Sequence, residues 1–576
     1  MALCKSRRGE LPPLRFATNA RDRTARLLCV GNAALISTES SFTFSRSASV
    51  ALALLSAGLQ VLAFPSPALA WVAWIAFVPL LIVLLQRPLL LRHAFLFSYL
   101  CGIAWYAGTC YWIFHSMHYY GGISSPASLG IVVLFCLYLG LYHGIFGWLM
   151  AALARRRAFS GMRILWVAPF VWVAVEFARY HVTGFPWDLL GTAIVDNLAL
   201  IRIAPFTGVW GLSWLILAVN AWMAAAVLQR HRRTLVAGIV AIVILQIGNL
   251  LPTTVSPATR RARLVQENLP ILDQGWTPEF YDTTLAELVE LSRNGIAMPP
   301  ATFAPTTMPD APGSRPKTVD VVIWPESPAP FYTNEIKFRS WISTLAAEVH
   351  APLIVGSIGA KAAAGGTAAT DARQYYNSAL LVSSNGNFES RYDKIRLVPF
   401  GEYVPFQRLL FFAESLTKEV STFARGERRV VFPLGQGGRA GVFICYESVF
   451  PDEVRQFVTG GATVLVNISN DGWFGETGAP GQHLNMARMR AIENRRWLLR
   501  ATNTGITAAI DPYGRVVTRA ERNSRLALDV PFDYVAETTF YTRHGDWFPW
   551  TCAIIVLAAA GVVVKKSHYI GPLERP

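Results

Sequence analysis

GVFICYES, residues 441–448, is an apolar run that ends abruptly at a cysteine followed by polar side chains. The first four residues predict a buried β-strand, and a helical stretch follows at Asp452–Val458. A cysteine at a strand-to-helix turn lies at the edge of a sheet, beside backbone N–H groups that can stabilise an oxyanion. A lone cysteine is otherwise a small core residue, so Cys445 as a nucleophile needs support from elsewhere in the chain.

Two further segments have the same shape. VVIWPE, residues 321–326, is an apolar strand that ends at the carboxylate of Glu326. YDKIRLVPFGE, residues 392–402, presents Lys394 just after a strand and a second carboxylate, Glu402, eight positions later. One charged residue at a strand end is usually solvated. Glu326, Lys394 and Cys445 at three strand ends of one domain together predict a catalytic site.

The region around these segments, about residues 252–548, alternates short β-branched runs with helical stretches, which indicates an α/β domain. Segments 299–317 and 360–371 are rich in small residues and proline, and we expect them to be surface insertions. The expected strands are Arg263–Val265, Val319–Trp324, Pro352–Gly356, Ser378–Val382, Ala440–Cys445, Ala462–Ile468 and Gly505–Ile510. The expected helices are Pro278–Arg293, Glu335–His350, Asp452–Val458 and Gly481–Arg500.

Composition places the rest of the chain in a membrane. Of 576 residues, 53% are hydrophobic and only 15% charged, which excludes a wholly soluble protein and a disordered one. Of the seven cysteines only Cys445 lies in the α/β domain, which excludes a disulfide scaffold. About eight apolar runs approach the length that crosses a bilayer. They are Ala48–Phe64, Leu69–Gln86, Ala94–Phe114, Ser128–Ala152, Ile164–Arg179, Val209–Leu228, Leu235–Leu251 and Trp550–Val564.

The basic residues give the orientation, because Lys and Arg accumulate on the cytoplasmic side of helix ends. They cluster after the second, fourth, sixth and eighth runs, whereas the loop 180–207 holds only Arg202. We therefore expect a basic, disordered tail (1–46), seven spans (47–251), an external domain (252–548), an eighth span (549–566) and a cytoplasmic tail (567–576). The net charge of +15 is then mainly a topology signal and gives little support to nucleic-acid binding.

WPES, YDKIRLVPFGEYVPF and CYES resemble the Glu–Lys–Cys segments of the nitrilase (carbon–nitrogen hydrolase) superfamily. Together with the preceding membrane region, residues 48–566 resemble the apolipoprotein N-acyltransferase family of the bacterial inner membrane. The resemblance implies an αββα sandwich in the periplasm beside a helical membrane bundle. It also implies an acyl transfer from a phospholipid such as phosphatidylethanolamine, through a cysteine thioester, to the α-amine of a diacylglyceryl apolipoprotein.

Carried over by motif, the resemblance makes Cys445 the nucleophile, Glu326 the general base and Lys394 the oxyanion stabiliser. The backbone N–H of Tyr446 is the second expected oxyanion donor. Glu402 and Glu447 match supporting acidic positions that orient Lys394 or the incoming amine. Trp276 matches an aromatic residue near the substrate, although a core tryptophan explains it nearly as well. We expect a monomer without a cofactor or metal.

Two alternatives use the same residues differently. A membrane-tethered amidase would let water resolve the thioester, although eight spans exceed what an anchor needs. A scaffold without chemistry would not require Glu326, Lys394 and Cys445 together. Near the site, Leu409–Phe412 could form a lid towards the bilayer or a buried turn. Gly184–Trp187 could line the same cavity or belong to an aromatic belt at the membrane interface.

Overall fold

The computed structural model describes residues 42–230, 232–249, 256, 258–270, 276–297, 318–362, 373–399, 401–403 and 423–567. The expected lid at Leu409–Phe412, the insertion at 299–317 and most of both tails lie outside these residues. Phe44–Leu85 and Leu89–Pro576 form one compact unit. Gln86–Pro88 belong to a second unit with the N-terminal residues, where the Arg87 N–H donates to the Phe42 carbonyl at 3.0 Å.

Two β-sheets form the centre of the α/β domain. Among the described residues the first has the order β2 (Ile296–Ala297), β13 (Leu526–Phe532), β1 (Arg260–Gln266), β3 (Val321–Ile323), β4 (Leu353–Ala362), β5 (Arg373–Val382) and β6 (Phe388–Asp393). The second, described in the same residues, has the order β12 (Val516–Arg519), β11 (Ala508–Ile510), β10 (Leu498–Thr502), β9 (Val464–Ser469), β8 (Gly438–Ile444) and β7 (Val431–Gly435).

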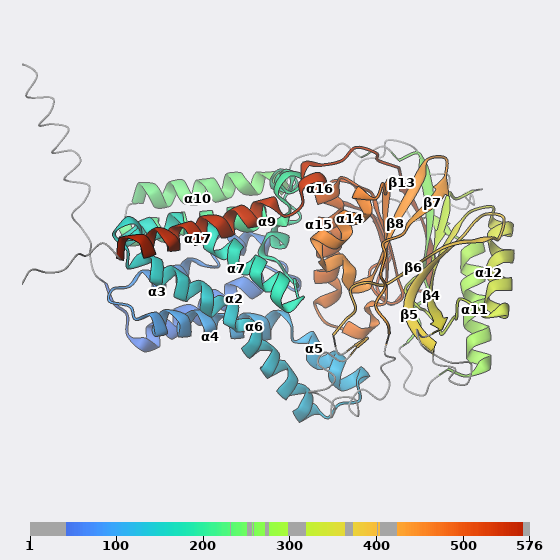
Figure 1. Ribbon diagram of the computed structural model, residues 1–576, viewed down its shortest axis with the longest axis horizontal. Helices are drawn as coiled ribbons and strands as arrows, with labels where there is room; N and C mark the ends of the chain where they lie inside the picture. The colour runs from blue at the N-terminus through green and yellow to red at the C-terminus, as the bar shows by residue number, and fades with distance from the viewer. Residues whose placement is uncertain are drawn as a thin grey trace, which may run out of the picture. The chain divides into compact units, whose positions relative to one another are not determined.

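Period-two burial explains how the sheets pack. On β3, Val321 and Ile323 belong to the core between the two sheets, whereas Val322 faces the helices α11 (Pro278–Arg293) and α12 (Ile336–Val349). Helices α14 (Pro451–Thr459) and α15 (Ala479–Asn494) cover the second sheet (Figure 1). The layers confirm the expected αββα sandwich.

The predicted C-terminal end of one helix is wrong. The predicted helix Gly481–Arg500 stops at Asn494, and Arg495 adopts a left-handed conformation with φ of +51°. The chain then enters β10, which pairs in parallel with β9 and antiparallel with β11. Leu498 and Leu499 are fully buried between these strands, so the sheet overrides a local pattern that favours a helix.

The other half of the chain is helical at each of the eight apolar runs. Within the described residues, α6 (Ser125–Ala154) and α9 (Val209–Gln229) are long and apolar enough to cross a membrane. Shorter apolar helical segments are Arg46–Leu62, Ala70–Leu85 and Trp547–Gly561, the second of which is interrupted. The helical elements of this part other than α6 and α9 are α2 (Arg46–Leu62), η1 (Ala70–Trp74), α3 (Val78–Leu85), α4 (Leu91–Thr109), α5 (Trp112–His115), η2 (Ser116–Tyr120), η3 (Arg157–Phe159), η4 (Gly161–Trp166), α7 (Ala168–Thr183), η5 (Leu190–Ile194), η6 (Leu200–Ile203), α8 (Ala204–Thr207), α10 (Arg232–Gln246), η7 (Ile247–Asn249), α16 (Phe540–His544) and α17 (Trp547–Ser567).

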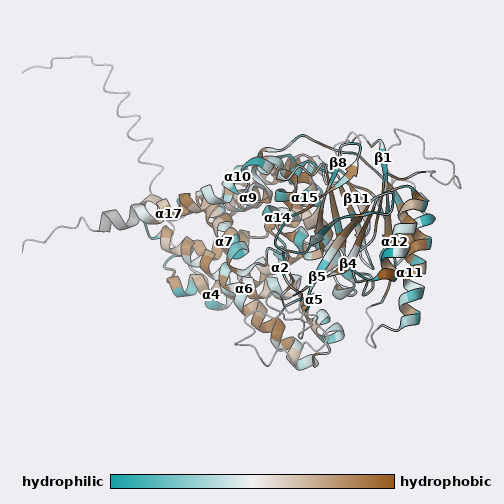
Figure 2. Ribbon diagram, turned by 45° about the vertical axis from the view of Figure 1, so that its right-hand side comes forward, coloured by the Kyte–Doolittle hydropathy of each residue, from teal (hydrophilic) through white to brown (hydrophobic). Residues whose placement is uncertain are grey.

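The second apolar run is not one continuous helix. It divides into η1 and α3, and a buried side chain of α9 occupies the break. The amide of Asn220 accepts from the Phe77 N–H at 2.8 Å and donates to the Ala73 carbonyl at 2.8 Å. These two bonds satisfy the backbone groups that the break leaves without helical partners. Figure 2 shows hydrophobic residues along α6, while hydrophilic patches mark the outer helices α11 and α12.

Candidate active site

Three strands deliver the expected catalytic side chains. Glu326 follows β3 and Lys394 follows β6, both in the first sheet, whereas Cys445 follows β8 in the second. All three side chains are buried, with relative exposures of 7%, 1% and 8%. The site lies against the apolar core between the two sheets. In this low-dielectric surrounding, interactions between charges are stronger than in water.

Lys394 lies between two carboxylates. Its Nζ is 3.0 Å from Glu326 Oε1 and 3.0 Å from Glu402 Oε1. Burial alone would lower the pKa of Lys394, but the two carboxylates raise this pKa well above its ordinary value. The ammonium therefore stays charged at neutral pH, as an oxyanion stabiliser must.

Cys445 lies at a strained turn. Its φ is +49°, in the left-handed region that a residue with a side chain rarely adopts, and a short 3₁₀ turn follows from Cys445 to Val449. Burial raises the pKa of the Cys445 thiol well above its usual range. The charge of Glu326 raises this pKa further, while Lys394 acts in the opposite direction. The resting sulfur is protonated, so its attack requires a base, and Glu326 is close enough for its charge to act on the thiol.

Asn377 is a member of this site that sequence reasoning missed. From β5 its Nδ2 donates to Glu326 Oε1 at 2.8 Å and to Glu402 Oε1 at 2.7 Å. It therefore fixes the same two oxygens that hold the ammonium of Lys394. The available signal was a polar residue at the start of the buried run NSALLV, residues 377–382.

The two supporting glutamates have different positions. Glu402 contacts the Lys394 ammonium and also accepts from the Val398 N–H at 2.8 Å. Glu447 is fully buried and instead accepts from the N–H groups of Ile395 (2.7 Å), Arg396 (3.0 Å) and Ile444 (2.7 Å), and from the Tyr392 hydroxyl (2.7 Å). Glu447 thus joins the backbone beside Lys394 to the backbone beside Cys445, and its expected role in orienting Lys394 or the incoming amine stays a prediction.

Tyr446 connects the site to the helical half. Its hydroxyl donates to the Gly184 carbonyl at 2.9 Å, and its ring centroid is 6.4 Å from that of Phe185. Trp187, in the same loop, is buried and donates from Nε1 to Gln482 Oε1 at 2.7 Å. The loop that was expected to line the cavity therefore lies against the residue that follows Cys445.

Trp276 lies just before the start of α11. Its ring centroid is 4.9 Å from that of Phe280, and it packs against the hydrophobic cluster beneath α11 and α12. That cluster is on the face of the first sheet opposite the inter-sheet core. Trp276 is half-buried there, and its expected place beside the substrate stays a prediction.

A second buried polar network, also missed from the sequence, lies under the Cys445 turn. His483 Nε2 is 2.7 Å from Ser448 Oγ and 3.1 Å from the Cys445 carbonyl oxygen. His483 Nδ1 is 3.0 Å from Asp471 Oδ1, and Arg500 Nη2 donates to Asp471 Oδ2 at 2.8 Å. Burial and the charge of Arg500 lower the pKa of His483, so the imidazole is neutral. Its signal was the polar run ISNDGWFGETGAPGQHL that follows β9.

Two family models match separate parts of this chain. The family model described as apolipoprotein N-acyltransferase N-terminal domain matches residues 56–222, and the carbon–nitrogen hydrolase model matches residues 269–540. An amidase of the nitrilase superfamily from Nesterenkonia (17% identity, TM-score 0.33) aligns over 48% of this chain and 92% of its own. Saccharomyces cerevisiae Nit3 (17% identity, TM-score 0.33) aligns over 49% and 93%.

Curated relatives match over most of their length. The apolipoprotein N-acyltransferase of Geobacter metallireducens is 36% identical over 532 residues, which cover 90% of this chain and 96% of the relative. Those of Methylococcus capsulatus and Vibrio cholerae are each 33% identical, over 79% and 77% of this chain and 84% and 83% of theirs. With helical elements matching one family model and the Glu326, Lys394 and Cys445 domain matching the other, the chain belongs to the apolipoprotein N-acyltransferase family.

Proposed function

We propose that this chain moves a fatty acyl group from a phospholipid, through a thioester on Cys445, to the α-amine of a diacylglyceryl-cysteine at the N-terminus of an apolipoprotein. The observation that carries the proposal is the buried Glu326–Lys394 pair beside the strained Cys445 turn. Family membership supplies the acceptor class, because the relatives are named apolipoprotein N-acyltransferases.

In the first step Glu326 takes the proton of the Cys445 thiol while the sulfur attacks the ester carbonyl carbon of the phospholipid. The oxyanion that forms is stabilised by the Lys394 ammonium and the Tyr446 backbone N–H. Collapse breaks the ester C–O bond. The lysophospholipid alkoxide receives the proton from Glu326 and leaves, and the acyl group remains on sulfur as a thioester.

In the second step the α-amine attacks the thioester carbonyl carbon and gives a proton to Glu326. The C–S bond breaks, the amide is released, and the proton returns to the Cys445 sulfur. Glu402 and Asn377 keep Glu326 and Lys394 in position through both steps, since Glu402 accepts from the Lys394 ammonium and Asn377 donates to the oxygens of Glu326 and Glu402 that bind it. The relay predicts ping-pong kinetics.

Both substrates are lipids, and we propose that the helical half spans the inner membrane eight times with the α/β domain in the periplasm. The proposed divisions are 47–251, 252–548 and 549–566, with cytoplasmic tails at both ends. Large apolar side chains stay exposed on the helices, among them Leu134 (68%) on α6, Val243 (59%) on α10 and Leu557 (69%) on α17. Such surfaces are unfavourable in water and match hydrocarbon. Reporter fusions after Arg157 and Arg233 should report the cytoplasm, and a fusion after Asp196 the periplasm.

The decisive experiment uses the full chain in detergent with a phospholipid labelled in its acyl chain. We expect a hydroxylamine-sensitive mass increase of one acyl group on Cys445, and its loss when a diacylglyceryl peptide with a free α-amine is added. A labelled N-acyl peptide should appear in equal amount. Labelling of any other residue, or acyl transfer by the Cys445→Ala variant, would refute the mechanism.

The competing function is hydrolysis of the same thioester by water, as in an amidase. Product masses separate the two, because hydrolysis yields the free fatty acid and leaves the peptide unchanged. We propose a monomer, in which the three catalytic side chains come from one chain, and a phosphatidylethanolamine-like donor.

A further inference from the structure

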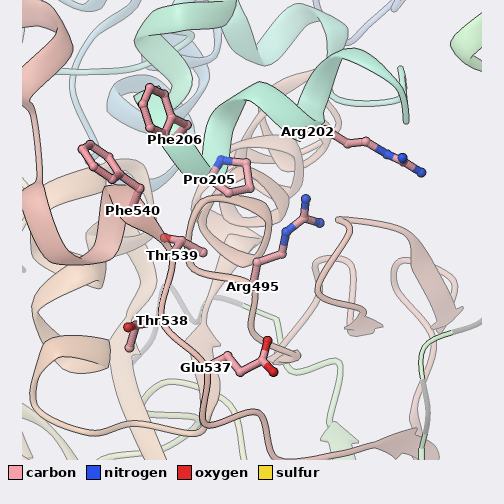
Figure 3. A pocket seen from close by; sticks show the side chains of 8 residues that line it. All are labelled: Arg202, Pro205, Phe206, Arg495, Glu537, Thr538, Thr539 and Phe540. Atoms are coloured by element: carbon pink, nitrogen blue, oxygen red, sulfur yellow. The ribbon is translucent and has the colours of Figure 1, made fainter.

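A pocket of about 340 Å³ lies away from the proposed catalytic residues, none of which lines it. One wall comes from η6 and α8, just before the proposed span α9. The other comes from the end of α15 and from the segment that leads into α16. The lining residues are Arg202, Pro205, Phe206, Arg495, Glu537, Thr538, Thr539 and Phe540 (Figure 3).

Two arginines give the pocket its charge. Figure 3 shows the guanidinium groups of Arg202 and Arg495 on one side of the pocket and the phenyl rings of Phe206 and Phe540 on the other. Burial lowers the pKa of Arg495, and the like charge of Arg202 acts in the same direction. Within the described part of the chain neither guanidinium forms an ion pair.

One carboxylate, Glu537, lines the pocket with the arginines, and the charge of Asp511 also acts on Arg495. Arg496 donates to the backbone carbonyl of Glu537, and its charge also interacts with the Glu537 carboxylate. Asp511 forms an ion pair with Arg515. The guanidinium of Arg495 stacks 4.4 Å above the ring of Tyr513 and donates to the Pro512 carbonyl at 3.4 Å, which orients it without neutralising it.

The aromatic side indicates where the pocket lies relative to lipid. The rings of Phe206 and Phe540 are 4.4 Å apart, and Trp547 Nε1 donates to the Phe206 carbonyl at 2.9 Å. Phe206 and Phe540 are exposed, at 49% and 38%. Phe206 lies in α8 and Phe540 begins α16, the short helices just before α9 and α17, and aromatic residues at the ends of spans commonly mark the level of lipid headgroups.

We infer that this pocket binds the phosphate of an outer-leaflet phospholipid, with Arg202 and Arg495 on the phosphate and Phe206 and Phe540 against the glycerol and upper acyl chain. Guanidinium groups match phosphate oxygens in two-pronged hydrogen bonds. The inference rests on the proposed orientation of α9 and α17 in the membrane. The inference also gives a role to Arg202, which is the only arginine or lysine in the external loop 180–207.

The test uses the full chain with Cys445→Ala, so that lipid is not consumed, in detergent with a phospholipid whose headgroup carries a photoreactive diazirine. We expect crosslinked peptides that contain residues 202–206 or 537–540. Arg202→Gln should reduce this crosslinking about tenfold at subsaturating lipid, the loss expected for one charge-assisted contact. Arg519→Gln, an exposed arginine on β12, is the matched control and should change nothing.

Two further probes identify the ligand. A diacylglycerol with the same diazirine but no phosphate should not crosslink there, and equal crosslinking would overturn the role of the arginines. Inorganic phosphate at millimolar concentration should not compete, and full competition would assign the pocket to free phosphate instead of lipid. Arg495→Gln should reduce crosslinking as Arg202→Gln does. Arg202→Gln is the variant less apt to disturb folding, because Arg202 is exposed.

Failure here is distinguishable from failure of the proposed function. If crosslinking at the pocket is absent while the wild-type chain still acylates a peptide, the pocket is refuted and the acyl transfer stands. If wild-type transfer is absent while the pocket crosslinks, the reverse holds.

Discussion

Two buried polar networks lie on either side of Cys445, and they differ in charge balance. The first has one cation, Lys394, shared by the carboxylates of Glu326 and Glu402. The second pairs Arg500 with Asp471, at 3.0 and 2.8 Å from one nitrogen, with neutral His483 beside them. The first network has one carboxylate more than it has cations, so one carboxylate can accept a proton. In the second network the charges of Arg500 and Asp471 are matched, and their ion pair stabilises the structure. We propose that the first network moves the proton and that the second supports the Cys445 turn.

The largest effect should come from removing the base. Glu326→Gln keeps the size of the side chain and removes its basicity, so we expect thioester formation to slow by about 10²–10⁴-fold. Rapid-quench mass spectrometry of the Cys445 adduct measures this directly. Glu335→Gln, a glutamate at the start of α12, is the control. An unchanged rate in Glu326→Gln would mean that another group takes the thiol proton.

The second network should respond mainly in stability. Arg500→Met leaves the carboxylate of Asp471 buried without its cation, which costs about 3–5 kcal/mol. Thermal unfolding of the full chain in detergent should show a large fall in Tm, and the double variant Arg500→Met, Asp471→Leu should recover part of it. If Arg500→Met instead lowers the acylation rate at unchanged Tm, the proposed division of roles is wrong.

Asn377 is the uncharged member of the first network, and replacing it tests whether the hydrogen bonds to Glu326 and Glu402 matter for the rate. Asn377→Leu removes two hydrogen bonds to carboxylates, and we expect thioester formation to fall at least tenfold through misplacement of Glu326. Gln374→Ala, on the exposed end of β5, should have the wild-type rate.

His483 is a positioning residue for the Cys445 turn. His483→Gln removes a ring nitrogen near the Cys445 carbonyl and Ser448, and a loss of about one hydrogen bond corresponds to a roughly fivefold slower thioester formation. The KM for phospholipid should not change, since His483 lies beneath the turn. A changed KM with a constant kcat would place His483 on the substrate instead.

Glu447 belongs to neither network and gives the smallest effect. Burial, with the charge of Glu453, raises the pKa of Glu447 to about 7 from an ordinary 4.5. The folded state therefore binds this proton more tightly, so its contribution to stability is full below pH 4.5 and is lost as the pH rises through 7. Glu447→Gln should flatten this part of the plot of Tm against pH. An unchanged slope would show that Glu447 is already ionised at low pH.

The motifs at the strand ends could be predicted from the sequence, because the residues of each motif are adjacent in the chain. A run such as GVFIC carries its strand, its turn and its reactive side chain within a few residues. Asn377 could not be assigned in this way, because its two partners lie 51 and 25 residues away and meet it only through sheet pairing. Arg500 was placed on a helix for a related reason. Its local sequence favours a helix, and only burial between β9 and β11 makes it a strand residue.

The hydrogen bond from Tyr446 to Gly184 has a consequence for engineering and for evolution. Tyr446, which follows the proposed nucleophile, donates its hydroxyl to a loop of the helical half, so that loop supports the Cys445 turn from outside. Cutting away the helices would not release a free-standing hydrolase, since it would expose the apolar rings around Tyr446 and leave the turn without its outer support. Any ancestor that acquired these helices had to fit its catalytic centre to them.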